Sequence, residues 1–318
     1  MLAERQPDDP PASDEIAIAN SRSIPSFVVG HHFLARASDG TIVGVGEAIW
    51  TETADNQHIV SSYVAVLPPH RGHGIARALF RHVVETAERV RRPLLVGWTD
   101  DRVPAGSAFA RHLGGVSGQE GHTNRLLLAD VDRAMVQRWL DEGPLRAPGY
   151  SLISVDGPYP IDLVQAITNL HHVMNTAPRD DFVEEHDVTV EEIRESEKGL
   201  VASGTTRWYI AARHDATGEL VGFTELFWNP KDDPRSAWQG GTAVRPEQRG
   251  HALGKWLKAA NLQRVFEELP QITNIRTYNA DSNDAMLGIN NALGFRPFYA
   301  TISWQLPVEK AREYLDAR

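Results

Sequence analysis

Two hydrophobic patterns, one with alternating apolar residues and one with the 3.6-residue spacing of a helix, predict the same elements twice along the chain. The C-terminal half is predicted to hold strands at 208–213, 219–228 and 275–278 and helices at 253–266 and 283–293. The N-terminal half is predicted to hold strands at 63–66 and 93–98 and helices at 75–90 and 106–113. Antiparallel strands followed by strand–helix–strand–helix indicate an α/β (α+β) fold, with a mixed sheet and helices on both faces.

Three separate sequence patterns recur at a nearly constant offset. Gly40–Trp50 recurs as Gly218–Trp228 and Pro68–His73 as Pro246–His251 at one and the same offset, and Leu113-Gly114 recurs as Leu293-Gly294 at an offset longer by two. The offset exceeds half the length of the chain, so the repeating unit is a domain rather than a solenoid repeat. The chain is therefore interpreted as a tandem duplication.

The duplication suggests domain boundaries. We expect a partly disordered segment at 1–30, a first domain at 31–142, a linker at 143–149 and a second domain at 150–318. The linker is placed in a stretch that contains Gly and Pro. A strand at 150–155 and a helix at 161–174 open the second copy and have no counterpart in the first. The first copy is therefore expected to lack its opening strand and helix, unless the true start of the protein lies upstream of Met1.

Composition narrows the function. The chain has 318 residues, 42% of them apolar and 23% charged, and no cysteine, which fits a soluble two-domain protein without disulfides or thiolate chemistry. A net charge of −10 argues against a general nucleic-acid binder. Neither an apolar run of about 20 residues nor a secretion signal is present, so we expect no membrane contact and a cytoplasmic location.

Each copy places Arg-Gly-His between a strand and a helix, beginning at Arg71 and at Arg249. The first turn of a helix has unpaired N–H groups and a partial positive charge, which together suit a phosphate group. Neither loop is a Walker motif or the Gly-x-Gly-x-x-Gly of dinucleotide folds. The alternative is a plain glycine-containing turn, which the recurrence disfavours.

These loops resemble the signature of the GNAT superfamily of N-acetyltransferases, Arg/Gln-x-x-Gly-x-Gly/Ala after a strand ending in Val-x-Pro. Arg71, Gly74 and Ala76 match it fully, whereas the second copy has Ala252 in place of the first glycine. A second family pattern, Asn followed by Gly-Phe eleven residues later, is matched by Asn283 with Gly294-Phe295. The chain is similar to the tandem, actinobacterial-type members, of which mycothiol synthase is one.

The resemblance implies acetyl-CoA or coenzyme A as cofactor, a small-molecule primary amine as acceptor, and a monomer or homodimer. The residues it assigns to coenzyme A are Val66, Arg71, Gly72, His73, Gly74, Ile75 and Ala76 in the first copy and Ala243, Val244, Arg249, Gly250, His251, Ala252, Leu253, Gly254, Lys255 and Asn283 in the second. Strand backbone beside each loop would stabilise the oxyanion of the reacting carbonyl.

In this family the amine attacks the thioester directly, and a tyrosine seven residues after the Asn protonates the thiol. Asn290 occupies that position here. An amide cannot supply a proton near neutral pH, so either Tyr278 or Tyr299 substitutes or the thiolate leaves with hydrogen bonds only. The corresponding positions of the first copy are Val103 and Ala110, without either function.

Glu47 and Glu225 are the candidates for the general base, because each lies mid-strand among apolar neighbours. The alternative is a carboxylate on a solvated sheet face. If the resemblance holds, Asn175, Asp180 and Asp181 would line the acceptor entrance; otherwise they form a solvated acidic loop. The pairs His31-His32 and His171-His172 lack metal-ligand spacing, and no metal is expected.

The second copy, with its opening strand and helix and Asn283, is predicted to be catalytic, and the first to bind coenzyme A or to buttress the pair. The reverse assignment stays open. A non-catalytic acyl-CoA sensor or scaffold is the alternative function, since the tyrosine is missing. A nucleotide-binding module of another fold is a third possibility, and it predicts ATP binding.

Overall fold

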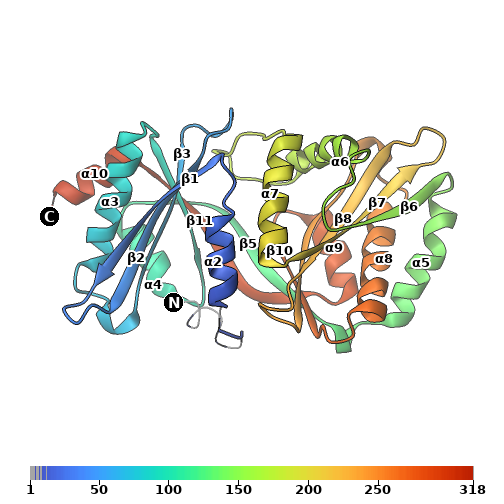
Figure 1. Ribbon diagram of the computed structural model, residues 1–318, viewed down its shortest axis with the longest axis horizontal. Helices are drawn as coiled ribbons and strands as arrows, with labels where there is room; N and C mark the ends of the chain where they lie inside the picture. The colour runs from blue at the N-terminus through green and yellow to red at the C-terminus, as the bar shows by residue number, and fades with distance from the viewer. Residues whose placement is uncertain (1–3, 5–6, 8, 12, 318) are drawn as a thin grey trace.

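The computed structural model describes residues 4, 7, 9–11 and 13–317 and has one continuous mixed sheet with helices on both faces (Figure 1). The strand order is β1-β2-β3-β4-β11-β5-β10-β9-β8-β7-β6. The strands are β1 (Val28–Arg36), β2 (Ile42–Thr51), β3 (Ile59–Val66), β4 (Leu94–Asp100), β5 (Val116–Leu127), β6 (Tyr150–Asp156), β7 (Thr206–His214), β8 (Leu220–Trp228), β9 (Ser236–Val244), β10 (Asn274–Ala280) and β11 (Arg296–Pro307).

The duplication is confirmed element by element. Strands β1 and β7 begin at the offset that separates the two Arg-Gly-His loops, and so do helices α3 (Ile75–Arg89) and α8 (Leu253–Glu268). Strands β5 and β11 begin at the slightly longer offset of the two Leu-Gly pairs, as do α4 (Pro104–His112) and α9 (Asp284–Leu293). The short helices η1 (Pro68–His70) and η4 (Pro246–Gln248) precede the two Arg-Gly-His loops.

The two repeats exchange their last strands. β11, from the end of the chain, pairs antiparallel with β4 of the first repeat, and β5, from the first repeat, pairs antiparallel with β10 of the second. β5 and β11 also pair with each other and join the two sides of the sheet. We therefore define a first lobe around β1–β4 and β11, and a second lobe around β5–β10.

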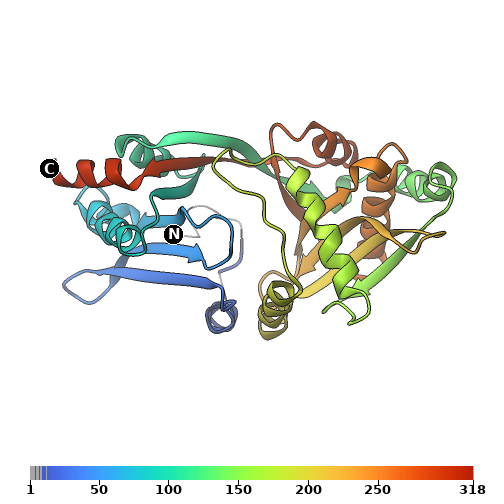
Figure 2. The ribbon, with the colours of Figure 1, turned by 90° about the horizontal axis from the view of Figure 1, so that it is seen from above.

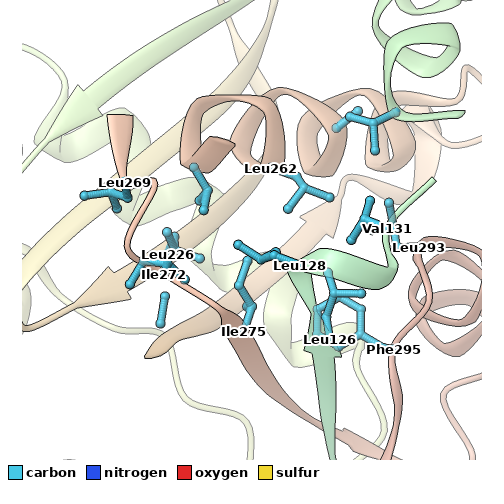
Figure 3. Packing of buried hydrophobic residues seen from close by; sticks show 14 of the residues in the cluster. Leu126, Leu128, Val131, Leu226, Leu262, Leu269, Ile272, Ile275, Leu293 and Phe295 are labelled. Atoms are coloured by element: carbon cyan, nitrogen blue, oxygen red, sulfur yellow. The ribbon is translucent and has the colours of Figure 1, made fainter. Parts of the chain in front are cut away.

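The helices that follow these strands are exchanged as well. α5 (Arg133–Arg146) packs on α8 of the second lobe, and α10 (Val308–Asp316) packs on α3 of the first (Figures 1 and 2). Leu126, Leu128 and Val131, which lie on β5, η2 (Leu128–Asp130) and the segment before α5, are buried among side chains of the second repeat, as Figure 3 shows. Burial of apolar surface across the exchange makes each lobe depend on the other repeat.

The second lobe has additional elements at its edge. β6 pairs outside β7, and α6 (Val164–His171), η3 (His172–Thr176) and α7 (Val190–Ser203) follow it. In the first lobe the sheet ends at β1, as expected from the missing opening strand, but α2 (Asp14–Arg22) precedes β1 as α7 precedes β7. α2 packs against α7 near the middle of the molecule (Figure 1).

Two expectations need correction. Residues 143–146, expected to begin a linker, form the last turn of α5. A Cβ on Gly143 would lie 2.4 Å from the ring of Trp256, so this glycine permits close packing of α5 on α8 rather than a turn. Within the segment 1–30, helix α2 and the start of β1 are ordered elements, while residues 1–3, 5, 6, 8 and 12 lie outside the described part. Across the described residues, no helix is long and apolar enough to cross a membrane.

Candidate active site

Each lobe has a cleft where two parallel strands diverge. β9 and β10 pair only at 236–238 with 274–276, and β3 and β4 pair only at 59–61 with 94–96. Beyond these short ladders, the strands separate toward their carboxyl ends. The second-lobe cleft has a volume of about 1200 Å³ and the first-lobe cleft about 950 Å³. Both are large enough for an extended cofactor-sized ligand.

The Arg-Gly-His loop of the second repeat lies at the mouth of its cleft. Arg249 donates from Nε to the Val244 carbonyl (3.1 Å) and from Nη2 to Thr176 Oγ1 (3.0 Å). Gly250 and Ala252 have φ values of +92° and +58°, and α8 begins at the next residue. Among the described residues, no backbone carbonyl accepts from the N–H groups of 250–253. These donors, with the positive end of the α8 dipole, fit a diphosphate.

The exchanged helix α5 supplies one wall of this mouth. Arg138, Trp139 and Arg146 line the cleft opposite the loop, and Lys255 Nζ lies 5.3 Å from the centre of the Trp139 ring. Arg146 also pairs with Glu142 (2.9 Å). Arginine and lysine side chains around an aromatic ring suit the phosphates and adenine of a nucleotide. The residues present therefore fit coenzyme A.

A bulge in β9 forms the inner wall of the second-lobe cleft. The register between β8 and β9 shifts after Thr224, so that two residues, Gly240 and Gly241, lie opposite the single residue Glu225. Both glycines line the cleft. A bulge re-aims backbone groups, and here the Gly241 N–H is directed at the Glu225 carboxylate.

Glu225 lies directly behind this bulge and is only 7% exposed. Its Oε1 accepts from the Tyr159 hydroxyl (2.9 Å) and lies 3.9 Å from His171 Nε2. Burial raises the pKa of this carboxyl above its ordinary value, against the hydrogen bond from Tyr159 and the charge of Arg207. Burial, together with Arg207, lowers the pKa of His171 to about 4, so that its ring is neutral at neutral pH.

Of the predicted proton donors, only Tyr278 lines the second-lobe cleft. Burial, together with Asp180 and Asp281, raises the pKa of its hydroxyl. Asn290 is fully buried and donates to Asn279 Oδ1 (2.8 Å), which itself lines the cleft. Tyr299 lies away from both clefts, beside Arg102 at the junction of the lobes.

Asn283 and the predicted acceptor residues have structural hydrogen bonds. Asn283 lines the cleft and also caps α9 by accepting from the Met286 N–H (3.3 Å). Asn175 is bonded to the backbone of His186, and Asp180 accepts from Ser303 Oγ (3.0 Å) and the Gln119 N–H (2.5 Å). Asp181 is exposed. Their sequence neighbours Val173, Met174, Thr176, Ala177 and Pro178 line the cleft instead.

The first-lobe cleft differs at both ends. At its mouth, Arg71 donates to both oxygens of Glu4 (2.8 and 2.5 Å), so a carboxylate already pairs with this loop. At the position equivalent to Glu225, the Glu47 side chain is 33% exposed and lies 3.4 Å from His32. Trp304 and Tyr314, from the exchanged β11 and α10, line this cleft.

The sequence matches the family described as "Acetyltransferase (GNAT) family" over residues 3–114 and 170–295, which together span most of the chain. The chain belongs to the GNAT acetyltransferase family. A solved tandem GNAT protein from the clavulanic acid biosynthesis pathway is 26% identical, with a TM-score of 0.80 over 96% of this chain and 92% of that protein. A GCN5-related N-acetyltransferase from Sphaerobacter thermophilus, 13% identical, has the same fold (TM-score 0.62; 96% and 89% covered). No curated protein gave a significant match.

With the family shown, the protein is a tandem GNAT acetyltransferase, and its duplicated α/β fold was predicted correctly from the sequence. Sequence reasoning missed Tyr159 and Lys258, and it missed Gln119, which reaches the second-lobe cleft from the first repeat. Gln119 could not be found without the strand exchange. The sequence did contain a signal for Lys258, because the offset between the repeats aligns this charged residue with the apolar Phe80. Among the described residues, no group of three His, Asp or Glu side chains is placed to hold a metal ion.

Proposed function

We propose that the second lobe transfers an acyl group from acetyl-CoA or a related thioester to a primary amine, and that the first lobe supports it. The observation that carries this proposal is that a loop with free backbone N–H groups lies at the mouth of the second-lobe cleft, while a covered carboxylate lies behind the β9 bulge that forms the wall of the same cleft. In the first lobe, the loop arginine is paired with Glu4 and the carboxylate is open to solvent.

The reaction needs one bond formed and one broken. The amine nitrogen attacks the thioester carbonyl carbon, a C–N bond forms, and the C–S bond breaks. The amine releases one proton to a base and the departing thiolate gains one, so the products are an amide and the free thiol of coenzyme A. Backbone groups around Gly240 and Thr242 would stabilise the developing negative charge on the carbonyl oxygen, while the Gly241 N–H is bonded to Glu225.

Glu225 is the proposed proton acceptor. Its raised pKa brings the carboxylate closer to the proton affinity that a base requires near neutral pH. Tyr159, bonded to both Glu225 and His171, is placed to pass a proton along this chain of side chains. The Gly241 backbone N–H is directed at the same carboxylate and connects it to the cleft wall.

Tyr278 is the proposed donor to the thiolate. A tyrosine hydroxyl has an ordinary pKa of about 10 and is protonated at neutral pH, and burial raises the pKa of Tyr278 further. Tyr278 is also the predicted tyrosine that lines the cleft. Asn279 and Asn290 form a buried amide pair next to Tyr278, and this pair would orient the reacting groups rather than protonate the thiolate.

A matched pair of substitutions tests the assignment of the lobes. Gly254 and Ala76 occupy the same second position of α8 and α3, and each lines its own cleft. A Cβ at Gly254 would lie 3.2 Å from Ile289 Cδ1, so Gly254→Val narrows the second-lobe cleft. We expect Gly254→Val to abolish thiol release with an amine panel and Ala76→Val to retain most of it.

Equal loss in both variants would contradict the assignment and indicate that the two clefts cooperate. Tight binding of acetyl-CoA without release of thiol for any amine would instead support an acyl-CoA sensor. Calorimetric titration of both variants separates a binding defect from a catalytic one.

A further inference from the structure

A lysine is buried at the inner end of the second-lobe cleft. Lys258, on α8, is 3% exposed and lines the cleft together with Gln239. Both also border a small void of about 10 Å³ next to Asn261. The ammonium lies 5.7 Å from the centre of the Phe295 ring, and among the described residues it makes no hydrogen bond or ion pair.

A buried ammonium without an anion is unfavourable, because no carboxylate offsets the hydration that burial removes. Burial alone lowers the pKa of Lys258 to about 7. Among the described residues no acidic side chain opposes this change, so none of them supplies a compensating negative charge.

A buried amide beside Lys258 also lacks partners. Asn261 is 1% exposed, and neither its Nδ2 nor its Oδ1 has a hydrogen-bond partner among the described residues. Buried amide groups are normally hydrogen-bonded. Lys258, Asn261 and Gln239 are thus the polar residues around a small void that apolar side chains otherwise line, and of these three Lys258 and Gln239 also line the cleft.

The fold does not require polar residues here. At the equivalent positions, the first repeat has Phe80 and Val83, which are buried in the hydrophobic core of its lobe, and Ala110 in place of Asn290. The same helix thus packs with apolar side chains in one lobe and presents an ammonium and an amide in the other.

Lys258 lies at the end of the cleft that the acyl group of a donor would reach. A diphosphate at the α8 amino terminus lies at the mouth of the cleft, and the cleft closes where β9 and β10 begin to pair. Gln239 and Thr277 mark this closed end, because Thr277 Oγ1 donates across the gap to the Gln239 carbonyl (3.1 Å). Lys258 lies one turn of α8 farther along than Gly254 and points into this end.

We propose that the second-lobe cleft selects an acyl-CoA whose short acyl chain ends in a carboxylate, of the malonyl or succinyl class. This inference rests on the proposed function and names its donor. The terminal carboxylate would pair with the Lys258 ammonium, which lines the cleft. It takes no part in the transfer, in which the thioester carbon forms the C–N bond and loses the C–S bond as before.

Calorimetry on the full chain with three donors tests this. Butyryl-CoA has the acyl chain length of succinyl-CoA without its second carboxylate, and acetyl-CoA is the short reference. We expect succinyl-CoA to bind about 10- to 100-fold more tightly than butyryl-CoA, the range of a charge-assisted hydrogen bond. Lys258→Met should bring this ratio close to one while butyryl-CoA binding persists.

The matched control is Phe80→Met in the first lobe, which should leave the ratio unchanged. Lys258→Met removes a buried charge, so its melting temperature should equal or exceed that of the parent protein, which shows that the variant is folded. Equal affinity of the parent for succinyl- and butyryl-CoA, or an unchanged ratio in Lys258→Met, would overturn the inference and leave the transferase proposal intact. Absence of binding for all three donors would overturn both.

Discussion

The two lobes place the same glutamate in opposite surroundings. Glu47 on β2 and Glu225 on β8 are equivalent residues of the two repeats. Glu47 is one-third exposed beside His32, whereas Glu225 is covered by Tyr159 and His171. These two lie between β6 and η3, a segment with no counterpart among the described residues of the first lobe. Burial by the surrounding side chains, rather than the identity of the residue, raises the pKa of the Glu225 carboxyl.

The interiors of the clefts differ in the same sense. The first lobe uses Phe80 and Val83 to complete a hydrophobic core, and the second has Lys258 and Asn261 at those positions. Unpartnered polar groups reduce stability unless they serve a ligand. The comparison supports the proposed assignment of the chemistry to the second lobe and of a packing role to the first.

The largest expected effect concerns Glu197, which holds Tyr159 in place over Glu225. Glu197, on α7, is 5% exposed; it accepts from the Tyr159 N–H (2.7 Å) and pairs with Arg194 and Arg207. Removing one partner of a buried ion pair costs about 3–5 kcal/mol. We expect Glu197→Ala to lower the free energy of unfolding in urea by that amount. Glu195→Ala is the control; it removes an exposed hydrogen bond from the Ser26 N–H (2.6 Å) and should lower the free energy of unfolding far less than Glu197→Ala does.

The Glu197 pair also predicts a pH dependence. Burial opposes ionisation of Glu197, but the hydrogen bonds from the Tyr159 N–H, Arg194 and Arg207 outweigh it and hold its pKa below the ordinary value. Its contribution to stability is therefore complete above the unfolded pKa of about 4.3 and lost as the pH falls through the lower folded pKa. Equal acid sensitivity of Glu197→Ala and the parent would contradict this account.

The next largest effect separates the two glutamates directly. Removing a general base lowers kcat by about 10²- to 10⁴-fold, so Glu225→Gln should show a loss in this range and Glu47→Gln none. In the parent, kcat should fall as the pH drops through the raised pKa of Glu225, because the base must be ionised. This acid limb should lie above the ordinary glutamate range.

The Glu225→Gln variant also carries its own test of folding. A carboxyl whose folded pKa is raised destabilises the folded state progressively as the pH rises through that value. Glu225→Gln should therefore be at least as stable as the parent at pH 7, measured by thermal unfolding. Equal activity of Glu225→Gln and the parent would remove Glu225 from the mechanism.

The fold and the two Arg-Gly-His loops could be predicted from the sequence, but the completed site could not. The constant offset predicted the repeats, and local hydrophobic spacing predicted helices such as 253–266, observed as α8 (Leu253–Glu268). Strand exchange depends on which long-range pairing of β5 and β11 buries more surface, and local patterns do not encode that. The cover of Glu225 by Tyr159 is likewise a contact between residues 66 positions apart.

One missed helix did have a local signal. Thr189 and Glu192 form a capping box at the start of α7, and Gly204 ends the helix with a positive φ. Recognition of α7 would have drawn attention to Glu197, but the role of Glu197 depends on Arg207 from β7 and Tyr159 from the segment after β6. Those contacts appear only in the folded chain.

A smaller effect concerns the loop arginines. Arg71 pairs with Glu4, whereas Arg249 donates to a hydroxyl, so an anion must displace a carboxylate only in the first lobe. In the Gly254→Val background, only the first cleft is expected to bind acetyl-CoA. There, Glu4→Gln should tighten acetyl-CoA binding up to about fivefold, the limit of a partly exposed ion pair. The same substitution should not alter the second cleft, measured in the Ala76→Val background. Unchanged affinity in the first background would show that Glu4 does not compete with the ligand.

The smallest effect is at the turn that starts each helix. Ala252 has a φ of +58° where its counterpart Gly74 has +79°. An alanine in the left-handed conformation costs about 1–2 kcal/mol, so replacing it by glycine removes this strain. Glycine also gains freedom in the unfolded chain, which offsets about 0.4–1 kcal/mol of the stabilisation. Ala252→Gly should therefore raise the melting temperature by about 1–3 °C, and Gly74→Ala should lower it by a similar amount.

Neither of these two substitutions adds or removes a donor, because the backbone N–H groups that face the cleft stay in place. Coenzyme A affinity in Ala252→Gly should consequently match the parent, measured by calorimetry. A large gain in affinity would show that the alanine methyl obstructs the ligand, and the second loop would then be the weaker of the two. With affinity unchanged, the strain at Ala252 affects stability alone, and the functional difference between the lobes lies deeper in their clefts.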